Sequence, residues 1–209
     1  MRQTLLICDW SGVLSHDRDF VHQGVNAVLK HYGKKKITLD ELRTLMEGSV
    51  FDFYKKQGIS DPEEAFSRFH VWFRDYGHPT PIPHALSTIE TLLKRNIRVA
   101  LFSSHPSQIL QQEVVDYGYP KEIDVYGSMN KNFPNRVLEG FLESYPSDRV
   151  FYLGDTTIDI QLAHDHGIIS VAVADERYAY HTLDMLQRAS PHYIVQSICD
   201  ISSVLNSRD

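Results

Sequence analysis

A polar side chain follows an apolar run at three places in the sequence. Asp9 follows LLIC, Ser103 follows IRVALF, and Asp155 follows RVFYLG. Runs of this length and composition are typical of buried strands. In a parallel sheet the carboxyl ends of the strands meet at one edge, so residues that are far apart in sequence converge there. The sequence therefore predicts a single site that combines two carboxylates and a hydroxyl.

These residue types suit phosphoryl chemistry. Asp9 and Asp155 suit Mg²⁺, which takes one or two carboxylates together with backbone oxygens, water and a substrate phosphate. Once the phosphate charge is balanced, one carboxylate can attack phosphorus and form an aspartyl phosphate. Ser103 and its neighbour Ser104 offer hydroxyls to the phosphoryl oxygens, beside the N–H groups that open the following helix. Lys131, in a loop before another predicted helix, is suited to balance the remaining charge.

Each of these residues also has a purely structural interpretation. An Asp or Ser directly after a strand is commonly a turn residue or a helix cap. The segment GDTTID at 154–159 fits a strand-to-helix turn in the same way, and a single lysine such as Lys131 is usually a surface residue. The joint occurrence of the set, in an order that fits one crevice, is what favours a site. Trp10 is expected to pack in the core.

Composition and charge exclude several classes of protein. The chain has 209 residues, of which 42% are apolar and 23% charged, as in ordinary soluble globular proteins. Its net charge of −6 and its single basic run, Lys34–Lys36, argue against nucleic-acid binding. No stretch approaches the roughly 20 apolar residues that cross a bilayer, and we expect no membrane association and no signal peptide. Two cysteines, Cys8 and Cys199, form no disulfide pattern, so we expect a cytoplasmic protein.

Strand-length apolar runs alternate along the chain with segments of helical periodicity. The strands are expected at 5–8, 97–102, 123–126, 149–153 and 168–173. The helices between the later strands are expected at 85–94, 107–117, 135–144 and 158–166. Such alternation is typical of right-handed βαβ units. The sequence predicts an α/β fold, a three-layer sandwich around a mostly parallel, Rossmann-like sheet.

Residues 16–79 interrupt this alternation. They contain amphipathic helical patterns at 20–31, 38–46, 50–57 and 62–76 and no convincing strand. Thr38 and Glu41 form a capping-box pattern, and Asp61 precedes a proline and two acids, which is typical of a helix start. We therefore expect a core domain of residues 1–15 and 80–209, with a small helical domain at 16–79 inserted after the first strand.

The candidate site residues and the segments around them resemble motifs of the haloacid dehalogenase-like (HAD) hydrolase superfamily, in its phosphoglycolate-phosphatase-like branch. DWSGVL at 9–14 is similar to the first motif, D-x-D-G-T/V-L, and Ser103 to the second. KNFP at 131–134 is similar to the third motif, K-P-x-P, although Asn replaces the first proline. GDTTID at 154–159 matches the fourth, G-D-x-x-x-D, and ASPHYIV at 189–195 resembles the closing A-D-Y-V-I segment. The helical insert resembles the C1 cap of these proteins.

The resemblance implies a role for each matching residue. Asp9 would be the nucleophile and a Mg²⁺ ligand, the backbone carbonyl of Ser11 a second ligand, and Asp155 a third. Asp159 would be a supporting acid near the metal. The implied substrate is a small phosphorylated metabolite, whose identity the sequence does not reveal.

The remaining implied roles concern the phosphoryl group and the cap. Ser103 and Lys131 would hold that group in the transition state, and Gly12 and Gly154 would support the turns. Residues 47–49, Glu-Gly-Ser, stand where related enzymes place a substrate-contacting loop, although a turn between two helices explains them as well.

One position departs from the family pattern. Phosphatases of this family carry a second Asp at the position of Ser11, where it acts as general acid and base. A serine hydroxyl is a poor proton shuttle near neutral pH, and the loss of such help typically costs about 10²–10⁴ in rate. We expect the metal site to be unaffected, because the family uses only the backbone carbonyl at this position. Intact GDTTID together with Ser11 disfavours dehalogenation.

Three alternatives follow. In the first, the chain is a Mg²⁺-dependent phosphatase of modest rate, in which His16 or another group replaces the missing acid. In the second, it is a catalytically impaired relative that binds a phosphorylated metabolite or a protein partner. The third is a phosphonatase-like hydrolase, which needs a lysine of the helical insert to form a Schiff base. The lysines available for that role are Lys30, Lys34, Lys35, Lys36, Lys55 and Lys56.

Overall fold

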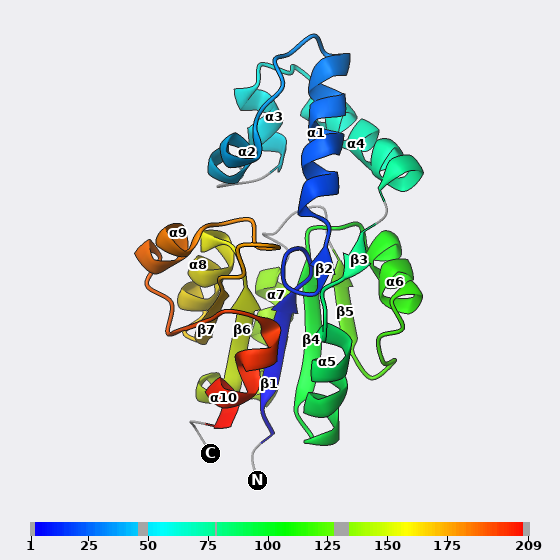
Figure 1. Ribbon diagram of the computed structural model, residues 1–209. Coiled ribbons are helices and arrows are strands. Elements are labelled where there is room, and N and C mark those ends of the chain that lie inside the picture. Colours follow the sequence, from blue (N-terminus) through cyan, green and yellow to red (C-terminus); the bar gives the residue numbers. More distant parts are fainter. Residues whose placement is uncertain (1–2, 46–49, 78, 128–133, 207–209) are drawn as a thin grey trace. The chain divides into compact units, whose positions relative to one another are not determined.

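The computed structural model describes residues 3–45, 50–77, 79–127 and 134–206 (Figure 1). The chain divides into two compact units. One consists of residues 1–15 and 81–209 and the other of residues 16–80. The boundary at which the chain returns from the helical unit to the larger one lies after residue 80, one residue later than the sequence predicts. No helix among the described residues is long and apolar enough to cross a bilayer.

The larger unit contains a six-stranded sheet in which every neighbouring pair is parallel. Along the sheet the strands are β5 (Asp124–Gly127), β4 (Arg98–Ser103), β1 (Leu5–Asp9), β6 (Val150–Gly154), β7 (Ile169–Val173) and β8 (Tyr193–Val195). The predicted α/β fold with a mostly parallel sheet is confirmed. The β8 strand was not predicted, because three residues at a sheet edge give no periodicity to detect.

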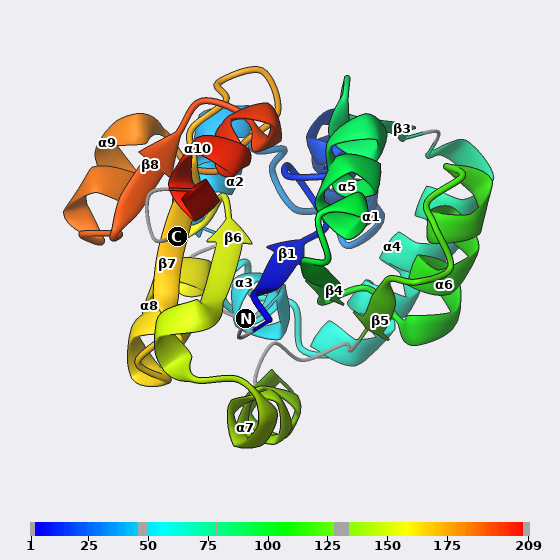
Figure 2. The same cartoon turned by 90° about the horizontal axis from the view of Figure 1, so that it is seen from below.

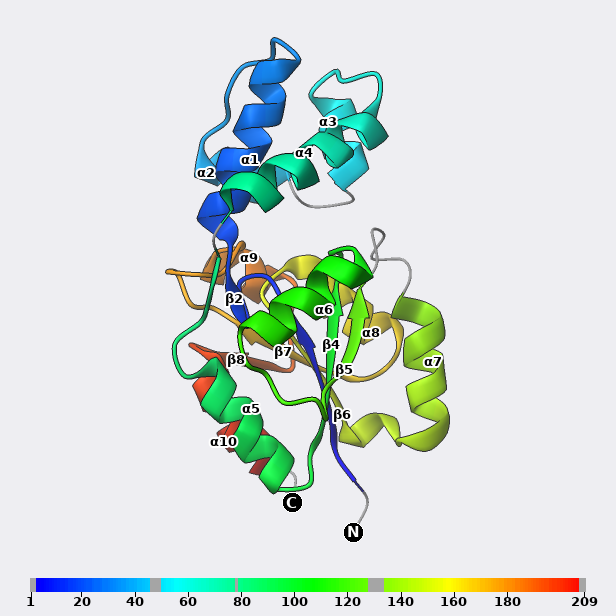
Figure 3. The same cartoon turned by 90° about the vertical axis from the view of Figure 1, so that its right-hand side faces the viewer.

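Helices cover both faces of this sheet (Figures 2 and 3). Leu6 and Cys8 of β1 pack on one face, and Leu5 and Ile7 pack on the other. All four side chains are fully buried, which explains why the first strand is continuously apolar instead of alternating. The first face is covered by α5 (Ala85–Lys94), α6 (Ser107–Asp116) and α10 (Ile201–Asn206), and the second by α7 (Pro134–Ser144) and α8 (Thr157–Asp165). A further helix, α9 (Leu183–Arg188), packs against α8.

The smaller unit is helical, and its helix starts follow the predicted caps. The Asp61 carboxylate accepts a hydrogen bond from the Glu64 N–H at 2.9 Å. Glu41 Oε2 accepts from the Thr38 N–H at 2.7 Å, and the Thr38 hydroxyl accepts from the Glu41 N–H at 3.1 Å. Gly24 lets two helices approach, since a Cβ there would lie 2.7 Å from the Trp72 ring. The helices are α1 (Arg18–His31), α2 (Leu39–Leu45), α3 (Val50–Lys56) and α4 (Pro62–Tyr76).

Short elements complete the chain. The strands β2 (Ser15–His16) and β3 (Thr80–Pro81) form a separate two-stranded sheet where the chain passes from one unit to the other. Two single 3₁₀ turns, at Ser147–Arg149 and Ile198–Asp200, precede β6 and α10. In the six-stranded sheet, β1 lies between β4 and β6, so the carboxyl ends of these three parallel strands lie side by side. Asp9 and Ser103 are the last residues of β1 and β4, and Asp155 directly follows β6.

Candidate active site

The chain makes a sharp turn immediately after β1. Asp9 ends the strand and is 3% exposed. The Trp10 carbonyl accepts hydrogen bonds from the N–H groups of Leu14 and Ser15, both at 2.9 Å, and the Gly12 N–H donates to the Ser15 carbonyl at 2.9 Å. We call residues 9–15 the nucleophile loop. These bonds close a tight turn that contains Ser11, two residues after Asp9.

Gly12 is required by the conformation of this loop and by its closeness to Asp155. Its φ is +76°, in the left-handed region that favours glycine. A Cβ at this position would lie 2.1 Å from the Asp155 Oδ2 atom and 3.2 Å from the Tyr178 carbonyl oxygen. Any other residue would have to displace the Asp155 carboxylate.

We expect Gly12→Ala to weaken both the fold and the site. Gly118→Ala is the matched control, because Gly118 has a φ of +75° and a Cβ added there would meet nothing within 4 Å among the described residues. The control should lower the free energy of unfolding by about 1–2 kcal/mol, the cost of a left-handed side chain. Gly12→Ala should lower it further and reduce Mg²⁺ affinity, as measured by denaturant unfolding and calorimetric titration. Equal losses in the two variants would contradict the contact with Asp155.

The GDTTID segment joins β6 to α8 through a capping box. The Thr156 side chain accepts from the Asp159 N–H at 3.3 Å, while Asp159 Oδ2 accepts from the Thr156 N–H at 3.0 Å and its hydroxyl at 2.6 Å. A Cβ on Gly154 would lie 2.3 Å from the Asp159 Cβ. The segment is therefore a strand-to-helix turn capped by Thr156, and the same turn delivers two buried acids to the sheet edge.

Asp9, Asp155 and Asp159 come together at this edge. One carboxylate oxygen from each lies within 4.8 Å of the other two, and all three side chains are buried. Burying several carboxylates together is costly unless a cation or hydrogen bonds compensate. A donor set made only of oxygens suits a hard divalent cation such as Mg²⁺. Asp159 Oδ2 accepts hydrogen bonds at the start of α8, and Asp155 Oδ2 accepts one from the Tyr180 N–H.

The surroundings reflect this concentration of charge. Tyr152 on β6 is buried, and burial together with the charges of Asp159 and Asp9 raises the pKa of its phenol well above the ordinary value. Burial, and then the charge of Asp9, also raises the pKa of the Cys8 thiol. Both groups stay neutral beneath the carboxylates, so they add no negative charge to the cluster.

Ser103 lies on the strand beside β1. Asp9 pairs with Phe102 in the sheet, so Ser103 stands one residue beyond the nucleophile. Its hydroxyl accepts from the His105 N–H at 3.2 Å and contacts the His105 Nδ1 atom at 2.9 Å. Ser104 is half-buried in the turn that leads to α6. The histidine contact was not predicted, although its position two residues after Ser103 is a visible signal.

Other sequence predictions are met only partly or lie elsewhere. Lys131 and residues 47–49 lie outside the described residues. His16 Nε2 lies 4.0 Å from the Asp19 carboxylate, within the helical unit. Of the six candidate lysines, Lys34 is half-buried and the others are exposed. None of the six stands in the apolar setting that Schiff-base chemistry favours.

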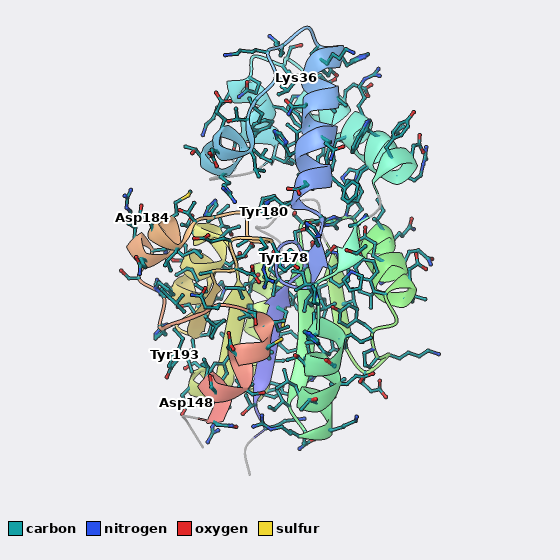
Figure 4. All side chains as sticks on the ribbon, in the orientation of Figure 1. Lys36, Asp148, Tyr178, Tyr180, Asp184 and Tyr193 are labelled. Carbon is teal, nitrogen blue, oxygen red and sulfur yellow. The ribbon has the colours of Figure 1, made fainter. Side chains whose placement is uncertain are left out.

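A segment after β7 contributes contacts that sequence reasoning missed. The Tyr180 N–H donates to Asp155 Oδ2 at 2.6 Å, and the His181 N–H donates to the Asp155 carbonyl at 3.3 Å. His181 Nδ1 accepts from the Thr157 N–H at 3.0 Å. Figure 4 labels Tyr178 and Tyr180, which lie at the end of the sheet away from the chain termini. The only signal for this segment in the sequence is its place after a predicted strand.

Comparison with known proteins agrees with this arrangement. A family model described as haloacid dehalogenase-like hydrolase matches residues 6–173, from β1 to the end of β7. The chain belongs to the haloacid dehalogenase-like hydrolase family. The predicted family is thus confirmed, and the matched region contains the nucleophile loop, Ser103 and GDTTID.

The chain is also similar in sequence to a relative whose name states an activity. Phosphonoacetaldehyde hydrolase from Vibrio cholerae is 24% identical over 157 residues, which cover 61% of this chain and 58% of the relative. The chain thus matches less than two thirds of the length of that relative.

Two solved structures share the fold. A predicted phosphoglycolate phosphatase from Haemophilus somnus has a TM-score of 0.80 at 18% identity, with 98% of each chain covered. A haloacid dehalogenase-like family hydrolase from Streptococcus pneumoniae has a TM-score of 0.81 at 16% identity, with 97% of this chain and 98% of the other covered.

Proposed function

We propose that this haloacid dehalogenase-like hydrolase is a Mg²⁺-dependent phosphatase that acts on a small phosphate monoester through phospho-Asp9. The observation that carries the proposal is the convergence of Asp9, Asp155 and Asp159 within 4.8 Å beside Ser103. Asp9 and Asp155, with the Ser11 carbonyl, would hold Mg²⁺, which when bound neutralises phosphate charge and favours attack by an anion.

The reaction begins at the Asp9 carboxylate. One of its oxygens attacks phosphorus, the bond from phosphorus to the ester oxygen breaks, and the alcohol leaves after taking a proton. Water then attacks the phosphorus of phospho-Asp9, which releases inorganic phosphate and restores the carboxylate. Both steps involve a proton transfer that Ser11 performs poorly, so we propose slow turnover.

Neighbouring groups hold the transferred phosphoryl group. The Ser103 hydroxyl and the N–H groups at the start of α6 would donate to its oxygens, and Lys131 would balance charge. The Tyr180 N–H keeps Asp155 oriented through its hydrogen bond to Oδ2. Asp159 would support the lysine and the metal while it caps α8.

The helical unit would act as a cap that opens and closes over the site and selects the substrate. Cys8 and Cys199 are both free thiols, which supports a cytoplasmic location for the protein.

The direct test is release of phosphate from a generic aryl phosphate. We expect slow release that depends on Mg²⁺ and stops when the metal is removed with a chelator. Restoring Mg²⁺ should restore the rate, and Ca²⁺, which is larger and accepts looser geometry, serves as the control ion. Metal-independent release at the same rate would contradict the proposal.

A phosphonate hydrolase is a second candidate, favoured by the name of the Vibrio cholerae relative. That chemistry would cleave a carbon–phosphorus bond after a lysine had formed a Schiff base with an aldehyde substrate. Borohydride would then trap the imine and inactivate the protein in the presence of phosphonoacetaldehyde. Phosphate release from phosphonoacetaldehyde, sensitive to borohydride and faster than release from the aryl ester, would favour this candidate.

A further inference from the structure

A partly buried hydrogen bond joins the nucleophile loop to α6. The indole Nε1–H of Trp10 donates to Glu113 Oε2 at 2.8 Å. Trp10 is fully buried, and it is the residue between the proposed nucleophile Asp9 and Ser11. The two partners are far apart in sequence, so this bond links the loop to a different part of the sheet unit.

Two tyrosines that follow α6 complete the attachment. The Trp10 ring stacks on Tyr117 with centroids 5.2 Å apart, and it meets Tyr119 edge-on at 5.6 Å. The Tyr119 hydroxyl donates to the Leu14 carbonyl at 3.3 Å, and the Tyr117 hydroxyl lies 3.2 Å from the Ser15 Oγ atom. Residues 113–119 therefore contact the nucleophile loop at both its beginning and its end. Within this set Glu113 supplies the polar contact to the Trp10 indole.

We propose that Glu113 is a positioning residue, which fixes the Trp10 indole and thereby the backbone that presents the Asp9 carboxylate and the Ser11 carbonyl. This inference rests on the proposed function. Trp10 is joined covalently to Asp9 and Ser11, so a shift of its backbone would move both of them. Its carbonyl also accepts from the N–H groups of Leu14 and Ser15, which ties the rest of the loop to it. A misplacement of reacting groups by even 1 Å costs much of the rate of an enzyme.

The charge of Glu113 is sensitive to pH in the neutral range. Burial raises the pKa of Glu113 to about 7, the hydrogen bond from Trp10 acts in the opposite direction, and the charge of Asp116 adds to the increase. An ionised acceptor makes a stronger hydrogen bond than a neutral one. The link to the nucleophile loop should therefore tighten as the pH rises through 7.

Other titratable groups lie near the pair. Burial raises the pKa of Tyr119 and of Cys8 above their ordinary values, so both stay neutral. On β5, which packs against α6, Asp124 is held by Arg98 at 2.7 Å.

Two substitutions at Glu113 separate positioning from simple packing. Glu113→Ala removes the acceptor, whereas Glu113→Gln keeps a carbonyl oxygen that can accept from the indole. We expect Glu113→Ala to weaken Mg²⁺ binding about fivefold by calorimetric titration and to lower kcat for the aryl phosphate about tenfold, with KM within about twofold. Glu113→Gln should restore most of both. Native-like Mg²⁺ affinity and kcat in Glu113→Ala would overturn the inference.

Tryptophan fluorescence tests the pair without turnover. The sequence contains two tryptophans, so Trp72→Phe leaves Trp10 as the only tryptophan, whose emission is selected by exciting outside the tyrosine absorption. Its emission should titrate with a midpoint near pH 7 and lose that titration in Trp72→Phe/Glu113→Gln. A flat pH profile in the first variant would contradict the inference. Absence of Mg²⁺ binding and of turnover in the native chain would instead contradict the proposed function, and the fluorescence result would still decide whether Glu113 acts on Trp10.

Discussion

Replacing Ser11 with aspartate is expected to raise the rate of phosphate release by about 10²–10⁴-fold, the usual contribution of general acid–base catalysis. Ser11 is half-buried and lies in the nucleophile loop directly after Trp10. A carboxyl group there would give a proton to the leaving alcohol and take one from the attacking water. The measurement is steady-state release from the aryl phosphate with saturating Mg²⁺.

Ser11→Asn is the matched control, because asparagine has nearly the shape of aspartate but its amide cannot act as a general acid or base near neutral pH. It should remain as slow as the native chain. Mass spectrometry of both slow proteins after exposure to substrate should show one added phosphoryl group, because phospho-Asp9 forms faster than water removes it. A native chain that is inert while Ser11→Asp is active would mean that the natural protein is a binding relative, and the proposed turnover would be wrong.

Asp9→Asn is expected to abolish turnover, lowering the rate by at least about a thousandfold. The amide is a poor nucleophile, and the substitution also removes one of the carboxylates that would hold the metal. Phosphate release and the added phosphoryl mass should disappear together, while circular dichroism stays native. The folded state should tolerate the change, since it removes one of three closely spaced buried charges.

Asp165→Asn provides the comparison for a carboxylate outside the site. Asp165 is exposed at the end of α8, where it accepts from Gln161 at 2.7 Å. Its rate should match that of the native protein. If phosphate release survives Asp9→Asn, another group carries the reaction and the mechanism through phospho-Asp9 is wrong.

The fold was largely predictable because its central strands are buried on both faces and are therefore almost continuously apolar. The β1, β6 and β7 strands are buried on every residue, so each produced a mostly apolar run in the sequence, with Ser170 as the polar residue within β7. The β8 strand escaped because it has three residues and Ile194 is 37% exposed. The burial that specifies a central strand is absent at an edge.

The position of the candidate site was predictable where it depends on side-chain types. Asp9, Asp155 and Ser103 could be proposed because their types are informative and the carboxyl ends of parallel strands converge, and the structure brings the two aspartates together. The contact of Tyr180 with Asp155 uses a backbone N–H, which any residue except proline supplies, so no residue type could reveal it. The Trp10 indole was correctly expected to pack, but its bond to Glu113 depends on tertiary structure alone.

The strand order of the sheet also constrains how the protein is made. The β1 strand is central and is synthesised before both of its neighbours, since Leu5 pairs with Arg98 on one side and Val150 on the other. Both edges of β1 must wait for later parts of the chain, whereas residues 16–80 complete their own helical contacts earlier. Non-local pairing of this kind folds slowly and leaves unpaired apolar edges exposed to aggregation. We expect nascent chains that stop before β6 to depend on chaperones, and the nucleophile loop to be among the last parts to reach its final form.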